Sequence, residues 1–133
     1  GDRFDLDMVD KVEPQLPRNT PVILADYPAE AAALARRKPG LPNLAERWEL
    51  FIGGIELANA YSELNDPAEQ RARFEECARR RKDLGKPVYP LDEEFLAVIA
   101  SMPPSGGIAL GIDRLLMLLT DSASLDDVLP FRD

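Results

Sequence analysis

The stretch ERWELFIGGIELANAYSELNDP, which runs from Glu46 to Pro67, consists of two apolar segments on either side of Gly53-Gly54. Paired glycines between such segments are typical of a two-residue turn, because glycine adopts a positive φ without steric cost. We therefore predict two antiparallel strands, Glu46–Ile52 and Ile55–Leu64, that form a β-hairpin.

Acidic side chains interrupt the apolar pattern of this hairpin. Around a two-residue turn, Phe51 is expected to pair with Glu56, and Glu49 with Ala58. Since paired residues share a face of the sheet, Glu49 and Glu56 are predicted to point to the same side. Two carboxylates on one face repel each other unless a cation lies between them. The pair is therefore a candidate Mg²⁺ site, in which nucleotide phosphates would supply further oxygen ligands.

Asn59 and Glu63 have the opposite parity to Glu56 along a regular strand. Because side chains alternate between the two faces, both would join the same site only if a β-bulge lies between Glu56 and Asn59. The alternative is an amphipathic hairpin whose acidic side chains are solvated and hold no ligand.

Prolines, capping residues and apolar periodicity predict the remaining elements. Asp66 followed by Pro67 is typical of a helix N-cap and first helical position. A hairpin followed by helices and a returning strand is typical of an α+β fold. The expected elements are helices at Leu6–Glu13, Ala29–Arg37, Pro67–Arg81, Asp92–Ala100 and Asp113–Leu119, strands at Val22–Leu24 and Gly106–Gly111, a loop at Lys38–Asn43 and a last helical turn at Ser124–Val128.

The composition excludes several classes of protein. Among 133 residues, 24 acidic side chains outnumber 16 basic ones, and the net charge of −8 disfavours a free-standing nucleic-acid binder. The lack of histidine excludes Ser-His-Asp and Cys-His catalysis and histidine-ligated zinc. The single cysteine, Cys77, cannot form an internal disulfide, which favours a reducing, cytoplasmic location. Because no histidine can activate its thiol, Cys77 is interpreted as a structural residue.

Neither a membrane span nor a secretory signal is expected. Apolar runs such as Leu115–Leu119 are far shorter than the ~20 residues that cross a bilayer. The N-terminal sequence GDRFDLD lacks a basic region followed by an apolar one. No membrane partner is therefore expected.

Two charged segments have alternative interpretations. The run Arg79–Lys82 at the end of a predicted helix is interpreted as a solvated, salt-bridged face, and contact with phosphate is the alternative. In Gly106–Arg114, the glycines would permit close approach to a planar ligand, and Arg114 is well placed for phosphate oxygens. Alternatively, Asp113 pairs with Arg114 or caps the helix. The Gly-Lys-Ser/Thr ending of a Walker A loop is missing.

Glu46–Pro67 resembles the lysine-site segment of class II lysyl-tRNA synthetases, and Gly107–Arg114 resembles motif 3 of the same class. The element Asp26-Tyr27-Pro28 and the C-terminal segment 120–131 also match. The resemblance implies part of the class II antiparallel sheet with flanking helices. We find neither motif 1 nor motif 2, so we expect residues 1–133 to be the C-terminal portion of a catalytic domain, inactive in isolation.

Some details are closer to the paralogue that lysylates elongation factor P. These are Ala31–Arg36, Glu56–Asn59, the loop Gly85–Asp92, and Ala109 where tRNA-charging enzymes typically have glycine. In contrast, Ala60–Asp66 is as similar to the tRNA-charging enzymes as any other segment of this chain. The resemblance thus implies lysine or β-lysine as substrate, elongation factor P or tRNA as acceptor, and a homodimeric parent protein.

The resemblance also implies roles for individual residues. Glu49 and Glu56 resemble the carboxylates that hold Mg²⁺ on ATP, and Arg114 resembles the arginine that clamps the γ-phosphate. The expected nucleotide contacts further include the Leu57 backbone and Gly111, which lets the strand approach the adenosine. The expected amino-acid contacts are Glu63 with the substrate ammonium, Asn59 as an orienting amide, and Ala109, whose methyl group would favour β-lysine.

The implied reaction is ATP-dependent amino-acid activation. The lysine carboxylate would attack the α-phosphorus of ATP to give lysyl-adenylate and pyrophosphate. Such catalysis relies on positioning and charge neutralisation, so it needs no histidine. The alternative, from a different functional class, is a catalytically inactive synthetase-like binding module.

Overall fold

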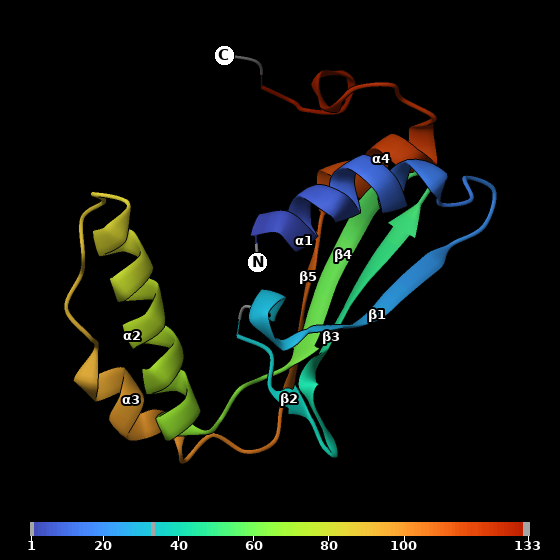
Figure 1. Cartoon of the computed structure of the whole chain (residues 1–133). Helices are drawn as coiled ribbons and strands as arrows, with labels where there is room; N and C mark the ends of the chain where they lie inside the picture. Colours follow the sequence, from blue (N-terminus) through green and yellow to red (C-terminus); the bar gives the residue numbers. More distant parts are fainter. Residues whose placement is uncertain (1, 33, 132–133) are drawn as a thin grey trace. The chain divides into compact units, whose positions relative to one another are not determined.

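The computed structural model describes residues 2–32 and 34–131, which belong to two compact units (Figure 1). The first unit comprises residues 1–62 and 106–133 and contains the β-sheet. The second unit, residues 63–105, contains two helices. The second unit is therefore inserted in the chain between two strands of the first.

The first unit is built on an antiparallel sheet with the strand order β1-β3-β4-β5, in which β2 also pairs with β3 (Figure 1). This arrangement, together with the helices, confirms the predicted α+β class. The strands are β1 (Val22–Pro28), β2 (Arg37–Lys38), β3 (Leu41–Ile52), β4 (Ile55–Ser62) and β5 (Gly106–Leu110).

The predicted hairpin is formed by β3 and β4. Gly53 and Gly54 have φ values of 64° and 81°, which suit the tight turn that paired glycines predict. A Cβ on Gly53 would also lie 3.3 Å from the Leu118 side chain, so packing favours glycine there as well. The hairpin prediction is confirmed, although β3 begins before Glu46.

The pairing register of the hairpin confirms one prediction and corrects another. Phe51 pairs with Glu56 as expected, but Glu49 pairs with Asn59 and not with Ala58. Leu57 is an extra residue in β4 that has no partner on β3, and it forms a β-bulge. The bulge lies between Glu56 and Asn59, where the sequence requires one if the acidic and amide side chains are to share a face.

The N-terminal helix is longer than predicted. It begins as α1 (Asp2–Asp7), continues as a π-helix at Met8–Val12 and ends in a 3₁₀ turn at Glu13–Gln15. Pro14 does not end the helix at Glu13, because proline is tolerated in the first turn of the new 3₁₀ segment, where it disrupts no hydrogen bond. The Phe4 ring packs edge-on against the Tyr27 ring of β1, and the two ring centroids lie 5.8 Å apart.

The predicted helix at Ala29–Arg37 is wrong. Only Ala29–Ala31 forms a 3₁₀ turn, Ala33 lies outside the described residues, and Arg37 belongs to β2. The helix propensity of alanine is overridden because Ala32 and Ala35 are buried with Ala45 of β3. Small side chains here allow the segment to pack closely on the sheet.

The predicted loop at Lys38–Asn43 is also wrong over most of its length. Lys38 ends β2 and pairs with Leu41, which begins β3. The turn is confined to Pro39-Gly40, and Gly40 has a φ of 78°. Pro42 is tolerated in β3 because it lies in the exposed end of the strand.

The remaining helices confirm the predictions to within two residues at each end. In the first unit, α4 (Ile112–Thr120) follows β5 and a 3₁₀ turn occupies Leu125–Asp127. In the second unit, α2 (Pro67–Asp83) begins at the expected N-cap, since Asp66 accepts hydrogen bonds from the backbone of Ala68 and Glu69. Helix α3 spans Glu93–Ile99 with Asp92 as its N-cap.

Candidate active site

The candidate site is built on one row of residues across the sheet. Glu49 of β3 lies opposite Asn59 of β4, and Asn59 lies opposite Ala109 of β5. Directly paired residues point to the same face, so the three side chains lie next to one another. We refer to them as the Glu49–Asn59–Ala109 row.

Glu49 is held in a defined position by two neighbours. Its Oε1 accepts a hydrogen bond from Arg47 Nη2 at 2.5 Å, and its Oε2 accepts one from the Tyr27 hydroxyl. The Glu49 side chain is only 11% exposed, so this ion pair is shielded from water. Burial, the hydrogen bond to Glu49 and the negative charge of Glu49 raise the pKa of Tyr27 far above its ordinary value.

Tyr27 reaches Glu49 because β1 contains an irregularity of its own. The register between β1 and β3 shifts between Ala25 and Tyr27, and Asp26 has a φ of 61°. This shift places Tyr27 opposite Ala45, on the face of β3 that also carries Glu49. A salt bridge from Lys38 to Asp26 supports the unusual backbone conformation.

Arg47 connects several groups of the site. Its Nε donates to Asn59 Oδ1 at 3.3 Å, and its Nη1 donates to the backbone oxygen of Ala31 at 2.6 Å. The guanidinium also lies over the Tyr27 ring, with its carbon 4.6 Å from the ring centroid. Sequence reasoning missed both Arg47 and Tyr27; the position of Arg47 two residues before Glu49 could have indicated that they share a face.

Glu56 and Arg114 form the second part of the site. Arg114 Nη1 donates to the backbone oxygen of Glu56 at 2.7 Å and lies 3.5 Å from Glu56 Oε2. Their side chains are 39% and 46% exposed respectively, so both can exchange this pairing for a ligand. Gly111, and not Asp113, is the N-cap residue of α4, so the alternative in which Asp113 caps the helix is wrong.

The close approach of β5 to the bulge is visible in the backbone. The Gly111 amide donates to the Leu57 carbonyl at 2.9 Å. A Cβ on Gly111 would lie 3.5 Å from the Arg114 side chain, in ordinary contact. The expected nucleotide contacts of Leu57 and Gly111 stay predictions, and this hydrogen bond places the two residues side by side.

Glu13 lies near the two carboxylates of the predicted Mg²⁺ site. Burial and the charges of Glu49 and Glu56 together raise the pKa of Glu13 above its ordinary value. The three carboxylates therefore influence one another, although Glu49 and Glu56 are also paired with Arg47 and Arg114. Within residues 2–32 and 34–131, no three acidic or cysteine side chains are arranged as a ligand set, so Mg²⁺ would need oxygens from a substrate.

Comparison with known proteins now gives the family. The family model "tRNA synthetases class II (D, K and N)" matches residues 2–133. The chain belongs to this family of class II synthetases.

Curated relatives of this class II synthetase chain are called lysine–tRNA ligases. The relative from Anaeromyxobacter sp. (strain K) is 51% identical over 120 residues, which are 90% of this chain and 23% of the relative. The relative from Clostridium perfringens (strain SM101 / Type A) is 50% identical over 84% of this chain and 22% of its own length. The chain thus spans less than a quarter of the length of these relatives.

Glu63 belongs to the second unit of the class II synthetase chain. Its backbone amide donates to Ser105 at 2.9 Å, which joins the two ends of that unit. Contact between the Glu63 carboxylate and a substrate ammonium stays a prediction.

A hollow of about 530 Å³ on this class II synthetase chain lies apart from the residues of the predicted site. It is lined by the neighbouring row Trp48, Ala60 and Ile108, whose side chains point to the opposite face from the Glu49–Asn59–Ala109 row. None of the residues predicted to bind substrate or metal lines it.

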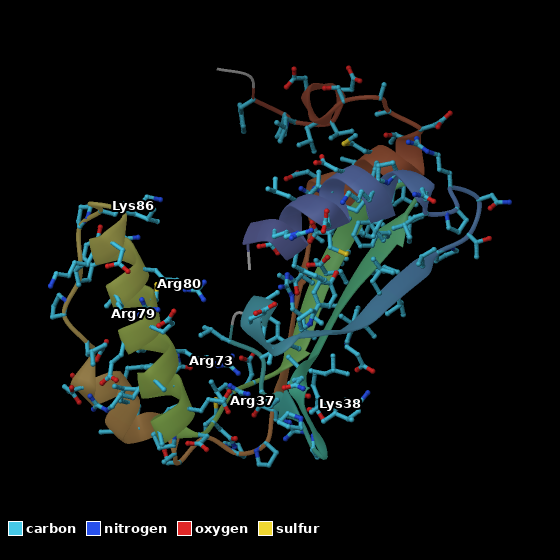
Figure 2. All side chains as sticks on the ribbon, in the orientation of Figure 1. Arg37, Lys38, Arg73, Arg79, Arg80 and Lys86 are labelled. Atoms are coloured by element: carbon cyan, nitrogen blue, oxygen red, sulfur yellow. The ribbon has the colours of Figure 1, made fainter. Side chains whose placement is uncertain are left out.

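The basic end of α2 is a salt-bridged surface in this class II synthetase chain (Figure 2). Arg79 and Arg80 both pair with Glu76, at 2.6 and 2.8 Å. These pairs support the solvated interpretation over phosphate binding. Cys77 on the same helix is an exposed free thiol. Within the described part of the chain, no helix combines the length and apolar character needed to span a membrane.

Proposed function

We propose that the protein containing this chain is an ATP-dependent ligase that activates lysine, and that residues 1–133 are the C-terminal portion of its catalytic domain. The observation that carries the proposal is the bulge at Leu57, which aligns Glu49 with Asn59 and Ala109 on one face of the sheet. The names of the lysine–tRNA ligase relatives support the choice of substrate.

In this proposal, Glu49 and Glu56 hold Mg²⁺ on the phosphates of ATP. Carboxylate oxygens are the donors that Mg²⁺ prefers. Burial, and then the charges of Glu49 and Glu56, raise the pKa of the nearby Glu13. Bound Mg²⁺ would neutralise phosphate charge as the nucleophile approaches. Arg114 exchanges its contact with Glu56 for the γ-phosphate, and its position at the first turn of α4 suits this role.

The remaining proposed contacts orient the amino acid. Asn59 orients lysine from the centre of the row, and Glu63 pairs with its ammonium group. The lysine carboxylate then attacks the α-phosphorus of ATP, and pyrophosphate leaves as lysyl-adenylate forms. The chain contributes by positioning the reactants and neutralising charge.

For the acceptor, the names of the relatives favour tRNA. A second candidate is elongation factor P with β-lysine as the activated amino acid. The observation in its favour is the pairing of Ala109 with Asn59, which places a methyl group beside the amide that would orient the substrate. We further propose that the parent protein is a homodimer, as the family resemblance implies.

The test is lysine-dependent ATP–pyrophosphate exchange by the natural polypeptide that carries this sequence, with α-lysine and β-lysine in parallel. We expect exchange, and the preferred lysine selects between the two acceptors. Glu56→Gln should reduce it at least ~100-fold, because a metal-binding carboxylate is lost. Glu94→Gln, which changes an exposed acidic residue of α3, is the matched control and should have no effect.

Exchange with neither lysine would overturn the proposal and favour the inactive binding module. The 133-residue chain should be assayed in the same experiment. We expect it to be inactive, because it contains neither motif 1 nor motif 2.

A further inference from the structure

Arg47, to which the sequence assigns no role, makes four contacts in and around the candidate site. Its three nitrogens each donate to a different group: Nη2 to Glu49, Nε to Asn59 Oδ1 and Nη1 to the Ala31 backbone. Its guanidinium carbon also lies over the Tyr27 ring. The side chain is 16% exposed, so these contacts are made largely away from water.

The contact with Asn59 determines which way its amide points. Because Arg47 Nε is a donor, the oxygen of the amide faces the guanidinium. The amide nitrogen, Nδ2, is then the group left for other partners, and it can only donate. An amide in this orientation presents a hydrogen-bond donor to an anionic acceptor.

We propose that Arg47 is a positioning residue that fixes the Asn59 amide as a donor to the carboxylate of the amino-acid substrate. This inference rests on the proposed function. In this role Arg47 acts through the Asn59 amide, whereas Glu49 is also held by the Tyr27 hydroxyl. The planar guanidinium matters here, because a lysine ammonium could not reach Glu49, Asn59 and Ala31 in one geometry.

Steady-state kinetics of the natural polypeptide test the proposal. Arg47→Lys and Arg47→Met should each raise KM for lysine by ~10-fold or more and change KM for ATP much less, since the amide loses its orientation. Arg36→Met is the matched control. Arg36 also forms a 2.5 Å pair with a glutamate of β3, Glu46, but that side chain points to the opposite face. Arg36→Met should leave the KM values for lysine and for ATP unchanged.

A double substitution separates positioning from a general structural effect. In an Asn59→Ala background, Arg47→Met should cause little further increase in KM for lysine, because the group that Arg47 orients is already absent. Independent, multiplicative effects of the two substitutions would overturn the proposal. Equal increases in both KM values with Arg47→Lys would also overturn it.

A second measurement does not depend on activity. The side-chain amide of Asn59 is followed by ¹⁵N relaxation in the natural polypeptide, with exposed Asn43 as the internal reference. We expect a high order parameter that falls to the Asn43 level in Arg47→Met. If this loss occurs but the natural polypeptide shows no lysine-dependent exchange, the proposed function fails while the orienting contact stands. An unchanged order parameter would overturn the orienting role of Arg47.

Discussion

Glu49 of β3 lies directly opposite Asn59 of β4, because Leu57 is an additional residue on β4 without a partner. The extra residue reverses the alternation of side chains along the strand. Glu56, before the bulge, and Asn59, after it, consequently lie on one face. The chemistry of the candidate site therefore depends on the length of β4 as much as on the identity of its residues.

Insertion of an alanine between Leu50 and Phe51 tests this dependence. The inserted residue should give Leu57 a partner on β3 and restore the regular alternation, which turns Glu56 to the face opposite Glu49 and Asn59. We therefore expect at least a ~100-fold loss of lysine-dependent exchange by the natural polypeptide. Leu57→Ala is the control, because it keeps the register and costs only ~2–5 kcal/mol of stability for the cavity. Both variants are compared at temperatures where they are folded. Similar exchange rates in the two variants would contradict the importance of the register.

The pKa of Tyr27 leads to a prediction at alkaline pH. Its pKa in the folded chain lies above the ordinary value of 10.0, mainly because of burial and then because of the hydrogen bond to Glu49. The stabilisation from keeping Tyr27 protonated is fully present below about pH 10 and is lost as the pH rises above it. Tyr27→Phe should remove this part of the pH dependence.

Urea unfolding between about pH 8 and pH 11 measures the effect of Tyr27. Tyr89→Phe, which removes an exposed tyrosine of the second unit, is the control and should follow the wild-type curve. If the free energy of unfolding of Tyr27→Phe falls with rising pH as steeply as that of the wild type, the buried, hydrogen-bonded position of Tyr27 is contradicted.

Glu13 gives a prediction at neutral pH and a probe for metal binding. Its pKa is raised by burial and by Glu49 and Glu56, so its stabilising contribution is present below about pH 4.5 and is lost as the pH rises through the pKa of the folded chain. Glu13→Gln should therefore raise the free energy of unfolding at neutral pH and have little effect in acid.

Mg²⁺ with ATP should diminish the benefit of Glu13→Gln, because a cation at Glu49 and Glu56 removes part of the repulsion. The test uses thermal unfolding of the natural polypeptide with and without Mg²⁺–ATP, and Glu30→Gln serves as a control for a carboxylate elsewhere. If Glu13→Gln raises the thermal stability equally with and without Mg²⁺–ATP, the result would argue against metal binding at Glu49 and Glu56.

The N-cap of α2 yields a prediction about stability alone. Asp66 accepts hydrogen bonds from Ala68 at 2.9 Å and Glu69 at 3.2 Å, so Asp66→Ala should lower the free energy of unfolding by ~1 kcal/mol. Chemical denaturation followed by circular dichroism measures the change. Glu94→Ala, on an exposed position of α3, should change stability by much less. Equal effects would mean that the cap contributes nothing specific.

Local rules account for what the sequence predicts well. The hairpin follows from Gly53-Gly54, and the start of α2 follows from Asp66 and Pro67, because each feature is determined by neighbouring residues. The need for a bulge could also be deduced, from the parity of Glu56 and Asn59. Such a bulge also makes Asn59, and not Ala58, the partner of Glu49, which is the register that the structure shows.

Tertiary packing accounts for what the sequence does not predict. Alanine-rich residues after Pro28 favour a helix locally, yet burial of Ala32 and Ala35 against the sheet prevents it. The contacts of Tyr27 with Arg47 and Glu49 depend on a register shift at Asp26, which no local pattern indicates. The network around the predicted carboxylate was therefore accessible only from the fold.

The hydrogen bond between Glu63 and Ser105 has a consequence for how the chain tolerates insertions. These residues are the first and last of the second unit, and they are joined beside the pairing of Ser62 with Gly106. Strands β4 and β5 are thus connected by a segment whose own first and last residues are hydrogen-bonded to each other. Because the entropy of closing a loop grows only with the logarithm of its length, segments of very different size can be accommodated there at similar cost. We therefore expect residues 63–105 to tolerate insertions better than the strands β4 and β5 that they connect.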